Sequence, residues 1–342
     1  MPTAVTIDYN ALKSDPASLE ADFKAAFGNG NDALGAIIIK GLPAEFPALR
    51  ERLLRLADKF ASLPEDVREK YARKEQQYMF GWSHGKEVMN GRPDLLKGSY
   101  YANPLVDRPD VTEEQRAEHH VYYGENVWPE KTEEGLEGFE VAFKELGRFI
   151  FEVGKLVAKA CEGFVSSQAS SRTASIADLI ANSQCNKARL LHYFPPSTKN
   201  GDEVVADDDA CGMHLDHSIL TGLCSAMYLS HEEAGEPKVV PPPDANAGLW
   251  ICPRRKGAEP VKVSIPADCL AFQTGEALQV LTEGRLAATP HYVTAGKEGG
   301  NVSRETFAFF LQPNVDEVIG KDGETFGQFT ERIMKEHYGE ES

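Results

Sequence analysis

The second half of the chain consists of short apolar or alternating runs that are separated by turn residues. From about residue 186 onward these runs are ARLLHYF, SILTGLCSAMYL, AGLWIC, VKVSI, CLAFQTG, QVLT, HYVTAG and TFAFFLQ. Such a series is typical of the strands of an antiparallel sandwich or barrel. The segment GEPKVVPPPDANAG (235–248) indicates an inserted loop, because three consecutive prolines cannot sit in a central strand.

The first half of the chain shows helical periodicity instead. Apolar residues recur at steps of three and four in two segments, Leu49, Leu53, Leu56, Phe60 and Leu63, and then Phe139, Phe143, Leu146, Ile150, Val153 and Val157. A strand is expected at 36–42 and a last amphipathic helix at 325–338. We therefore expect an α+β chain with a mainly β core, forming one unit over 1–342. Its parts are a mainly helical region (1–180), the β core (181–315) and a C-terminal helix (316–342).

Charge and composition exclude several classes of protein. The 342 residues carry a formal net charge of −17, which argues against nonspecific nucleic-acid binding. The apolar runs are too short to span a bilayer, and the start, MPTAVTIDYNALKSDP, lacks the features of a secretory signal. The six cysteines form no CxxC pair and indicate buried thiols in a reducing compartment. We expect a cytoplasmic monomer that binds a small molecule and has neither nucleic acid nor membrane as a partner.

The stretch GMHLDHSILTGL (212–223) contains a candidate metal site. His214 and Asp216 are two residues apart, so on a strand they point to the same face. A third ligand should come from a distant strand, and His291 in ATPHYVTAG is in a suitable place. Two imidazoles and one carboxylate on one side of a metal form the facial triad of non-haem Fe(II) oxygenases. His217 lies one residue after Asp216, so we expect it to face away from the metal.

A candidate carboxylate-binding pair follows in SRETFAFF. Arg304 and Thr306 are two residues apart on one strand face, and a guanidinium with a hydroxyl can together hold a carboxylate near the metal. Each of these features alone has a plainer interpretation. An HxD pair is more often a surface turn, a histidine can end a strand, and an arginine can protect a sheet edge. The order HxD, His, RxT within the strand-rich half favours the metal site.

Taken together, HLDHSILTGL, TPHYV and RETFAFFLQP resemble the non-haem Fe(II), 2-oxoglutarate-dependent oxygenase superfamily, in its isopenicillin-N-synthase-like branch. The segments VTIDYNAL, ALGAIIIKGLP, LPEDVREKY, SYYANP and NVWP are similar to earlier parts of that branch, so the resemblance covers most of the chain. It implies a double-stranded β-helix, a distorted jelly roll, wrapped by helices. It also implies Fe(II) on His214, Asp216 and His291, with room for O2.

The same resemblance implies a site for 2-oxoglutarate as cosubstrate. Arg304 and Thr306 match the family's Arg-x-Ser pair, and LLHYFPP places Tyr193 and His192 beside the cosubstrate. Phe194 and His192 depart from the family pattern, which commonly has tyrosine and asparagine there. The implied enzyme is a non-haem iron dioxygenase of secondary metabolism. It would oxidise an unactivated C–H bond of a small, carboxylate-bearing, amino-acid-derived metabolite, by hydroxylation, desaturation or oxidative ring closure.

The substrate pocket is expected in loops of the helical region. Relatives line their pockets with the segments that match QYMFGWSHGKEVMN and LLKGSYYANP, which supply aromatic walls, hydrogen-bond donors and one cation. The candidates are Tyr78, Phe80, Trp82, Lys97, Tyr100, Tyr101 and Asn103. For each aromatic residue, packing of the helices on the sheet is an equally good interpretation. Further cations that could bind an acidic substrate are Lys187, Arg189, Arg254 and Arg255.

Two other functions remain open at the level of sequence. Isopenicillin N synthase uses its Arg-x-Ser pair on the substrate's carboxylate and takes no 2-oxoglutarate, so an oxidase or oxidative cyclase is one alternative. The second alternative is a non-catalytic binding protein on the same sandwich, in which the histidines are structural.

Overall fold

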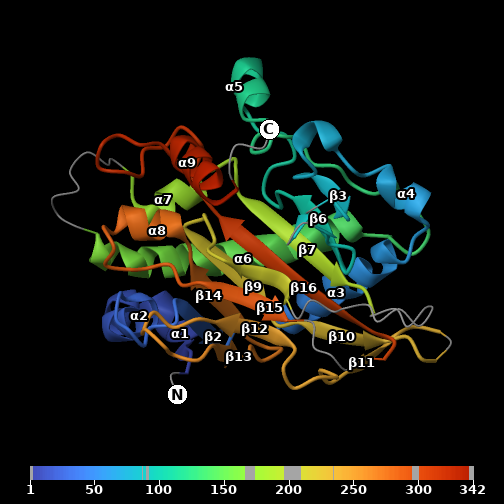
Figure 1. Cartoon of the computed structure of the whole chain (residues 1–342), viewed down its shortest axis with the longest axis horizontal. Helices are drawn as coiled ribbons and strands as arrows, with labels where there is room; N and C mark the ends of the chain where they lie inside the picture. Colours follow the sequence, from blue (N-terminus) through green and yellow to red (C-terminus); the bar gives the residue numbers. More distant parts are fainter. Residues whose placement is uncertain are drawn as a thin grey trace.

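Two β-sheets packed face to face form the centre of the molecule, and helices cover the outer face of the larger sheet (Figure 1). The computed structural model describes residues 3–86, 88–89, 92–165, 174–195, 209–233, 235–294 and 300–338. Within these ranges the chain runs from the large sheet to the small one and back more than once. This alternation is that of a double-stranded β-helix, as the sequence predicts.

The large sheet has a central path of eight strands. Their order is β1 (Val5–Asp8), β2 (Ala36–Lys40), β14 (Leu270–Thr274), β9 (Leu220–Cys224), β16 (Val302–Leu311), β7 (Lys187–Tyr193), β6 (Lys97–Ala102) and β3 (Gly81–His84). β10 (Met227–Ser230) also pairs with β16, and β11 (Lys238–Val240) pairs with β10. Within this sheet β1 and β2 are parallel, and the other described pairs are antiparallel.

The small sheet has the order β13 (Val261–Val263), β12 (Gly248–Ile251), β15 (His291–Thr294) and β8 (Asp209–His214). A separate short hairpin joins β4 (Val88–Met89) to β5 (Arg92–Pro93). The α-helices are α1 (Tyr9–Ser14), α2 (Glu20–Phe27), α3 (Phe46–Ala61), α4 (Glu65–Glu69), α5 (Glu113–Glu118), α6 (Phe139–Cys161), α7 (Ile176–Ala181), α8 (Glu276–Leu281) and α9 (Phe326–Tyr338). Three 3-10 turns are η1 (Pro16–Leu19), η2 (Lys74–Gln76) and η3 (Glu162–Phe164).

The two long helices form where the sequence shows helical periodicity. Their apolar stripes pack against the large sheet and against each other, with α3 and α6 in contact. Phe60 of α3 is at the centre of an aromatic cluster, with its ring centroid 5.2 Å from that of Trp82 and 5.0 Å from that of Tyr100. The helix expected at 325–338 is present as α9. This helical layer holds the sheet on its outer face and leaves the inner face to the second sheet.

Two parts of the fold differ from the sequence prediction. The region before residue 180 is mainly helical and contains the strand expected at 36–42 as β2, but it also contributes β1, β3 and β6 to the large sheet, so it is continuous with the β core. The run QVLT, expected as a strand, lies at the end of α8 and just beyond it. Such a short run does not distinguish a strand from a helix, and the buried positions Ala277, Leu278 and Leu281 have helical spacing.

Two further observations bear on the environment of the protein. No helix within the described residues is long and apolar enough to cross a membrane. The cysteines that the structure describes in full are all unpaired, and four of the five, Cys161, Cys185, Cys224 and Cys269, are buried.

The aromatic cluster around Phe60 predicts a large loss of stability when it is disrupted. Phe60 is 1% exposed, so Phe60→Ala should lower the free energy of unfolding by about 3–5 kcal/mol, because a cavity replaces the ring. Urea unfolding followed by circular dichroism measures the change. Phe149→Ala, which removes a partly buried ring stacked on Phe46, should cost less. A loss below about 1 kcal/mol for Phe60→Ala would contradict the packing described here.

Candidate metal centre and adjoining cavity

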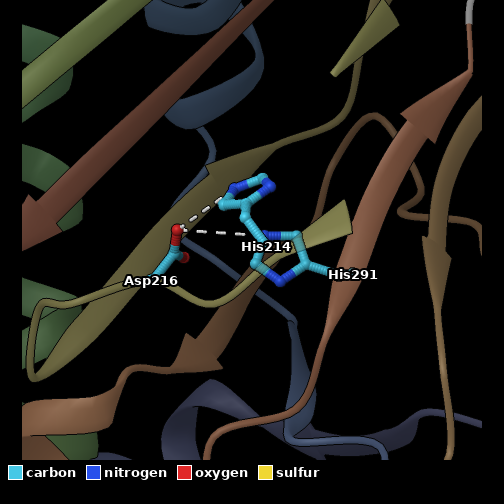
Figure 2. Close-up of side chains that lie close together, drawn as sticks. All are labelled: His214, Asp216 and His291. Atoms are coloured by element: carbon cyan, nitrogen blue, oxygen red, sulfur yellow. Dashed lines mark ion pairs between the residues drawn. The ribbon is translucent and has the colours of Figure 1, made fainter. Parts of the chain in front are cut away.

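The three expected metal ligands come together at one end of the small sheet (Figure 2). His214 is the last residue of β8 and His291 the first of β15, and the two residues are directly paired in the register of these strands. Asp216 lies in the loop after β8 and not on the strand itself. The loop is held where it is by the backbone N–H of Glu276, which donates to the carbonyl of Asp216 at 2.7 Å. Strand pairing thus places the two imidazoles, and a loop contact places the carboxylate.

The distances between the ligand atoms fit one ion. Oδ1 of Asp216 is 3.6 Å from Nε2 of His214 and 3.8 Å from Nε2 of His291. Two atoms that each lie about 2.0–2.3 Å from the same metal can be at most about 4.6 Å apart. Asp216 and His291 are buried, whereas the side chain of His214 is 35% exposed. The arrangement is a facial triad with an accessible side.

Hydrogen bonds from neighbouring groups orient all three ligands. Nδ1 of His214 donates to the carbonyl of Gly212 at 2.7 Å, which leaves Nε2 as the metal-binding atom. The hydroxyl of Thr221 donates to Oδ2 of Asp216 at 2.6 Å, which leaves Oδ1 for the metal. The side-chain amide of Gln273 lies 2.5 Å from Nδ1 of His291. Turning this amide so that its oxygen faces the ring gives the N–H a partner, and again leaves Nε2 for the metal.

Electrostatics favour the protonation states that a metal requires. Burial opposes ionisation of Asp216, but the imidazoles of His291 and His214 and the hydroxyl of Thr221 outweigh it and lower the pKa of Asp216. Burial also lowers the pKa of His291. At neutral pH the site therefore presents a carboxylate and a neutral buried imidazole, the forms that bind divalent metals. His217 points elsewhere, with Nε2 3.8 Å from a carboxylate oxygen of Glu276.

A cavity of about 620 Å³ between the two sheets adjoins the three ligands. Its wall includes three of the four residues expected to bind the cosubstrate, namely Arg304, Thr306 and Tyr193. Arg304 is 9% exposed, and its guanidinium lies 4.8 Å from the ring centroid of Tyr193. Nε and Nη1 of Arg304 are buried and have no hydrogen-bond partner among the described residues. Because unpartnered buried N–H groups of a cation are costly, this part of the cavity fits an anion.

The fourth expected residue, His192, lies on the other face of the sheet. It follows Leu191 and precedes Tyr193 on β7, and neighbouring residues of a strand point to opposite faces. Nδ1 of His192 lies 2.9 Å from a carboxylate oxygen of Glu305, which is next to Arg304 on β16. The expectation that His192 contacts the cosubstrate is therefore corrected.

The residues expected to bind the substrate lie outside this cavity. None of Tyr78, Phe80, Trp82, Lys97, Tyr100, Tyr101 and Asn103 belongs to its wall. Trp82 on β3 and Tyr100 on β6 pack around Phe60 of α3 and so belong to the hydrophobic core. Phe80, Tyr101 and Asn103 are also buried, Lys97 forms an ion pair with Asp94, and Tyr78 stacks under the amine of Lys86. The packing interpretation therefore holds for Trp82 and Tyr100, which lie on the two strands at the far edge of the large sheet.

The cavity wall contains residues that sequence reasoning did not single out. Arg50 of α3 and Lys262 of β13 are two of them, and Val239, Val240 and Pro242 come from the proline-rich insertion. Of the four cations noted in the sequence, Arg189 alone lines this cavity. Arg254 instead donates to the carbonyls of Gly28 and Ala287. The sequence did contain a signal for Arg189 as a cavity residue. Arg189 alternates with Leu191 and Tyr193 along β7, so all three share one strand face.

Comparison with known proteins agrees with this architecture. No model of a protein family matches the chain. The UPF0676 protein C1494.01 of Schizosaccharomyces pombe is 23% identical over 284 residues, which cover 80% of this chain and 75% of that protein. A 2OG-Fe(II) oxygenase family protein from Caulobacter crescentus has a TM-score of 0.68 at 19% identity, covering 98% of this chain and 99% of its own.

Two further structures have the same architecture. A Neurospora crassa protein, solved in complex with alpha-KG and 5-formyluracil, has a TM-score of 0.63 at 18% identity, with 92% of this chain and 86% of that chain covered. The dioxygenase for auxin oxidation of rice has a TM-score of 0.57 at 15% identity, with 99% of this chain and 97% of that chain covered. The chain thus has the fold of the 2-oxoglutarate- and Fe(II)-dependent oxygenases, the superfamily that its motifs resemble. The expected double-stranded β-helix is confirmed.

The geometry of the triad predicts a graded loss of metal binding. Asp216→Ala should bind one equivalent of metal less than the unmodified protein, because a ligand is missing. Thr221→Val keeps the ligand but removes the hydrogen bond to Oδ2, and should weaken binding at this site by roughly 10–100-fold. Anaerobic titration with Fe(II), followed by calorimetry, measures both effects, and thermal unfolding checks that each variant is folded. Equal metal content in Asp216→Ala and the unmodified protein would contradict the site.

Lys187 predicts a pH dependence of stability away from the cavity. Burial lowers the pKa of Lys187 to about 7, and its amine lies 3.8 Å from the ring centroid of Phe80. Between pH 7 and 10 the unfolded chain binds more protons at this group than the folded chain, so stability should rise with pH. The slope is at most about 1.4 kcal/mol per pH unit. Lys187→Met should remove this contribution, as measured by urea unfolding at several pH values. Parallel pH profiles of the two proteins would contradict the expectation.

Proposed function

We propose that the protein is a non-haem Fe(II), 2-oxoglutarate-dependent oxygenase that oxidises an unactivated C–H bond of a small, carboxylate-bearing metabolite. One observation supports this function above all. The cavity wall contains both a His–Asp–His triad and a buried arginine with two unpartnered N–H groups. A metal centre and a carboxylate-binding group within one cavity are what a metal-chelating dicarboxylate requires.

The residues present fit both groups. His214, Asp216 and His291 would hold Fe(II), whose chemistry with 2-oxoglutarate and O2 is to generate an oxidant strong enough for a C–H bond. Arg304 would hold the distal carboxylate of 2-oxoglutarate through its planar fork, with the hydroxyl of Thr306 on the same strand face. The Neurospora crassa protein was solved with alpha-KG, and the dioxygenase for auxin oxidation 1 of Arabidopsis thaliana with 2-oxoglutarate. We propose that the present chain binds the same cosubstrate.

The remaining cavity indicates the class of substrate. Arg189 is a second cation in the wall, and its Nε also donates to the hydroxyl of Ser99 at 2.9 Å. Much of the remaining wall is apolar and includes Leu191, Val240, Val293 and Phe310. Such a mixture of apolar surface with a few convergent polar groups is typical of small-molecule sites. On a chain of net charge −17, a cationic cavity selects for an acidic ligand, and Arg189 is the residue we assign to the substrate's carboxylate.

The role of Arg304 can be tested by the affinity for 2-oxoglutarate. Arg304→Lys keeps the positive charge but loses the planar fork, and should weaken 2-oxoglutarate binding by roughly 10–150-fold, the equivalent of about 1.5–3 kcal/mol. The measurement is an anaerobic titration of the Fe(II)-loaded protein, followed by the metal-to-ligand charge-transfer band. Arg189→Lys is the matched control, since it changes a second cavity arginine and should leave 2-oxoglutarate affinity within about two-fold.

The same titration separates the proposed function from its alternatives. Unmodified protein that binds Fe(II) but shows no charge-transfer band with 2-oxoglutarate would assign Arg304 to the substrate, as in an oxidase or oxidative cyclase. Protein that binds neither Fe(II) nor 2-oxoglutarate would be a binding protein on the same fold.

A further inference from the structure

A second cluster of potential metal ligands lies on the opposite face of the large sheet from the cavity. Asp58 of α3, His192 of β7 and Glu305 of β16 each offer a ligand atom, and these atoms all lie within 4.8 Å of one another. Their exposed fractions are 4%, 4% and 0%. We propose that Asp58, His192 and Glu305 bind a second divalent metal ion, distinct from the one at His214, Asp216 and His291.

The charge balance of the cluster favours a divalent cation. Among the described residues, neither Asp58 nor Glu305 forms an ion pair with a lysine or arginine, and the partners of these carboxylates are His231 and His192. The two carboxylates thus lack a permanent cation as a direct partner, and negative charge buried in this way is costly to keep uncompensated. Burial raises the pKa of both carboxyl groups, and for Asp58 it outweighs the opposing effect of His231, His192, Arg55 and Lys59. A divalent ion would neutralise the cluster in full.

The arrangement of donor atoms leaves a place for the ion. Oδ1 of Asp58 is buried and accepts no hydrogen bond of regular geometry among the described residues, although Nε2 of His231 lies 3.3 Å away. Both carboxylate oxygens of Glu305 face Nδ1 of His192, at 3.0 and 2.9 Å. The ligand atoms of Asp58, His192 and Glu305 come from a helix and two strands, so an ion among them would bridge α3 and the large sheet. An ion there would give this oxygen a ligand bond in place of the hydrogen bond that it lacks.

Two additional polar groups border the cluster. Nε2 of His231 is 3.3 Å from Oδ1 of Asp58 and 3.0 Å from the hydroxyl oxygen of Ser303, which in turn donates to Glu305 at 2.7 Å. The side chain of His231 is 24% exposed, whereas the three ligands are buried. The donor set of the ion is then one imidazole and two carboxylates, with His231 at its border. Mixed nitrogen and oxygen donors favour Zn²⁺ and similar transition metals over Mg²⁺ or Ca²⁺.

The position of the cluster assigns a structural role to this ion. Glu305 lies between Arg304 and Thr306 on β16, and His192 precedes Tyr193 on β7. A metal held by Asp58, His192 and Glu305 would tie α3 to the two strands that present Arg304 and Tyr193 to the cavity. None of its three ligands lines that cavity, so the ion itself would not meet the substrate.

The metal content of a variant that lacks the first site tests the proposal. Untagged Asp216→Ala protein would be loaded with Zn²⁺ and freed of excess metal by gel filtration. The amount of Zn²⁺ bound per protein molecule would then be measured by elemental mass spectrometry. We expect one equivalent of bound Zn²⁺ and, with Zn²⁺ in excess, a rise in Tm of about 5 °C. The Co²⁺-loaded form should show the visible d–d bands of a site with nitrogen and oxygen ligands.

Second substitutions in the same background locate the ion. Adding Glu305→Gln or Asp58→Asn should abolish binding, whereas adding Asp94→Asn, a change in a carboxylate paired with Lys97, should not. Circular dichroism identifies any variant that fails to fold. If one of the two cluster variants does not fold, the other is sufficient to locate the ion. Absence of bound metal in Asp216→Ala, or binding retained in both cluster variants, would overturn the proposal and leave a hydrogen-bonded cluster that shares protons. None of these measurements requires 2-oxoglutarate, so they stand apart from the test of the proposed function.

Discussion

The pairing of β8 with β15 is the interaction on which the rest of the site depends. It sets His214 opposite His291, two residues that are far apart in the sequence. The large sheet then orients both parts of the triad, because Thr221 of β9 and Gln273 of β14 are paired with each other and contact Asp216 and His291. A metal centre built in this way joins the two sheets. Its geometry therefore depends on the register of four strands together with the loop that carries Asp216.

Alternation along β7 and β16 gives the large sheet two chemically different faces. Arg304, Thr306 and Tyr193 point into the cavity, whereas His192 and Glu305 point toward α3. The cavity face contains a cation that needs an anion, and the outer face contains carboxylates that need a cation. Both needs arise from burial, since an uncompensated charge is far more costly inside the protein than in water. We propose that each is met by a bound group, the cosubstrate on one face and a metal on the other.

The charge of the cavity also opposes the charge of the whole chain. The sequence carries a net charge of −17, yet Arg304 and Arg189 lie in the cavity wall. The proline-rich insertion supplies part of the apolar wall through Val240 and Pro242. An acidic ligand is therefore repelled by the exterior in general and stabilised at one place. This contrast supports a carboxylate-bearing substrate, a class that the sequence interpretation favoured from the family resemblance and from the candidate pocket cations.

The sequence by itself determined the class of fold and predicted which three residues come together as candidate metal ligands. Periodicity separates the helices α3 and α6 from the strand-rich half, and the order of His214, Asp216, His291 and Arg304 along that half matches the ligand order of a known superfamily. The lateral order of the strands was decided by the tertiary structure alone. Aromatic residues such as Trp82 and Tyr100 have the same pattern in a pocket wall as in a core, and only their packing on Phe60 distinguishes the two. His192 likewise faces Glu305 because of strand register, a relation between distant segments that no local pattern records.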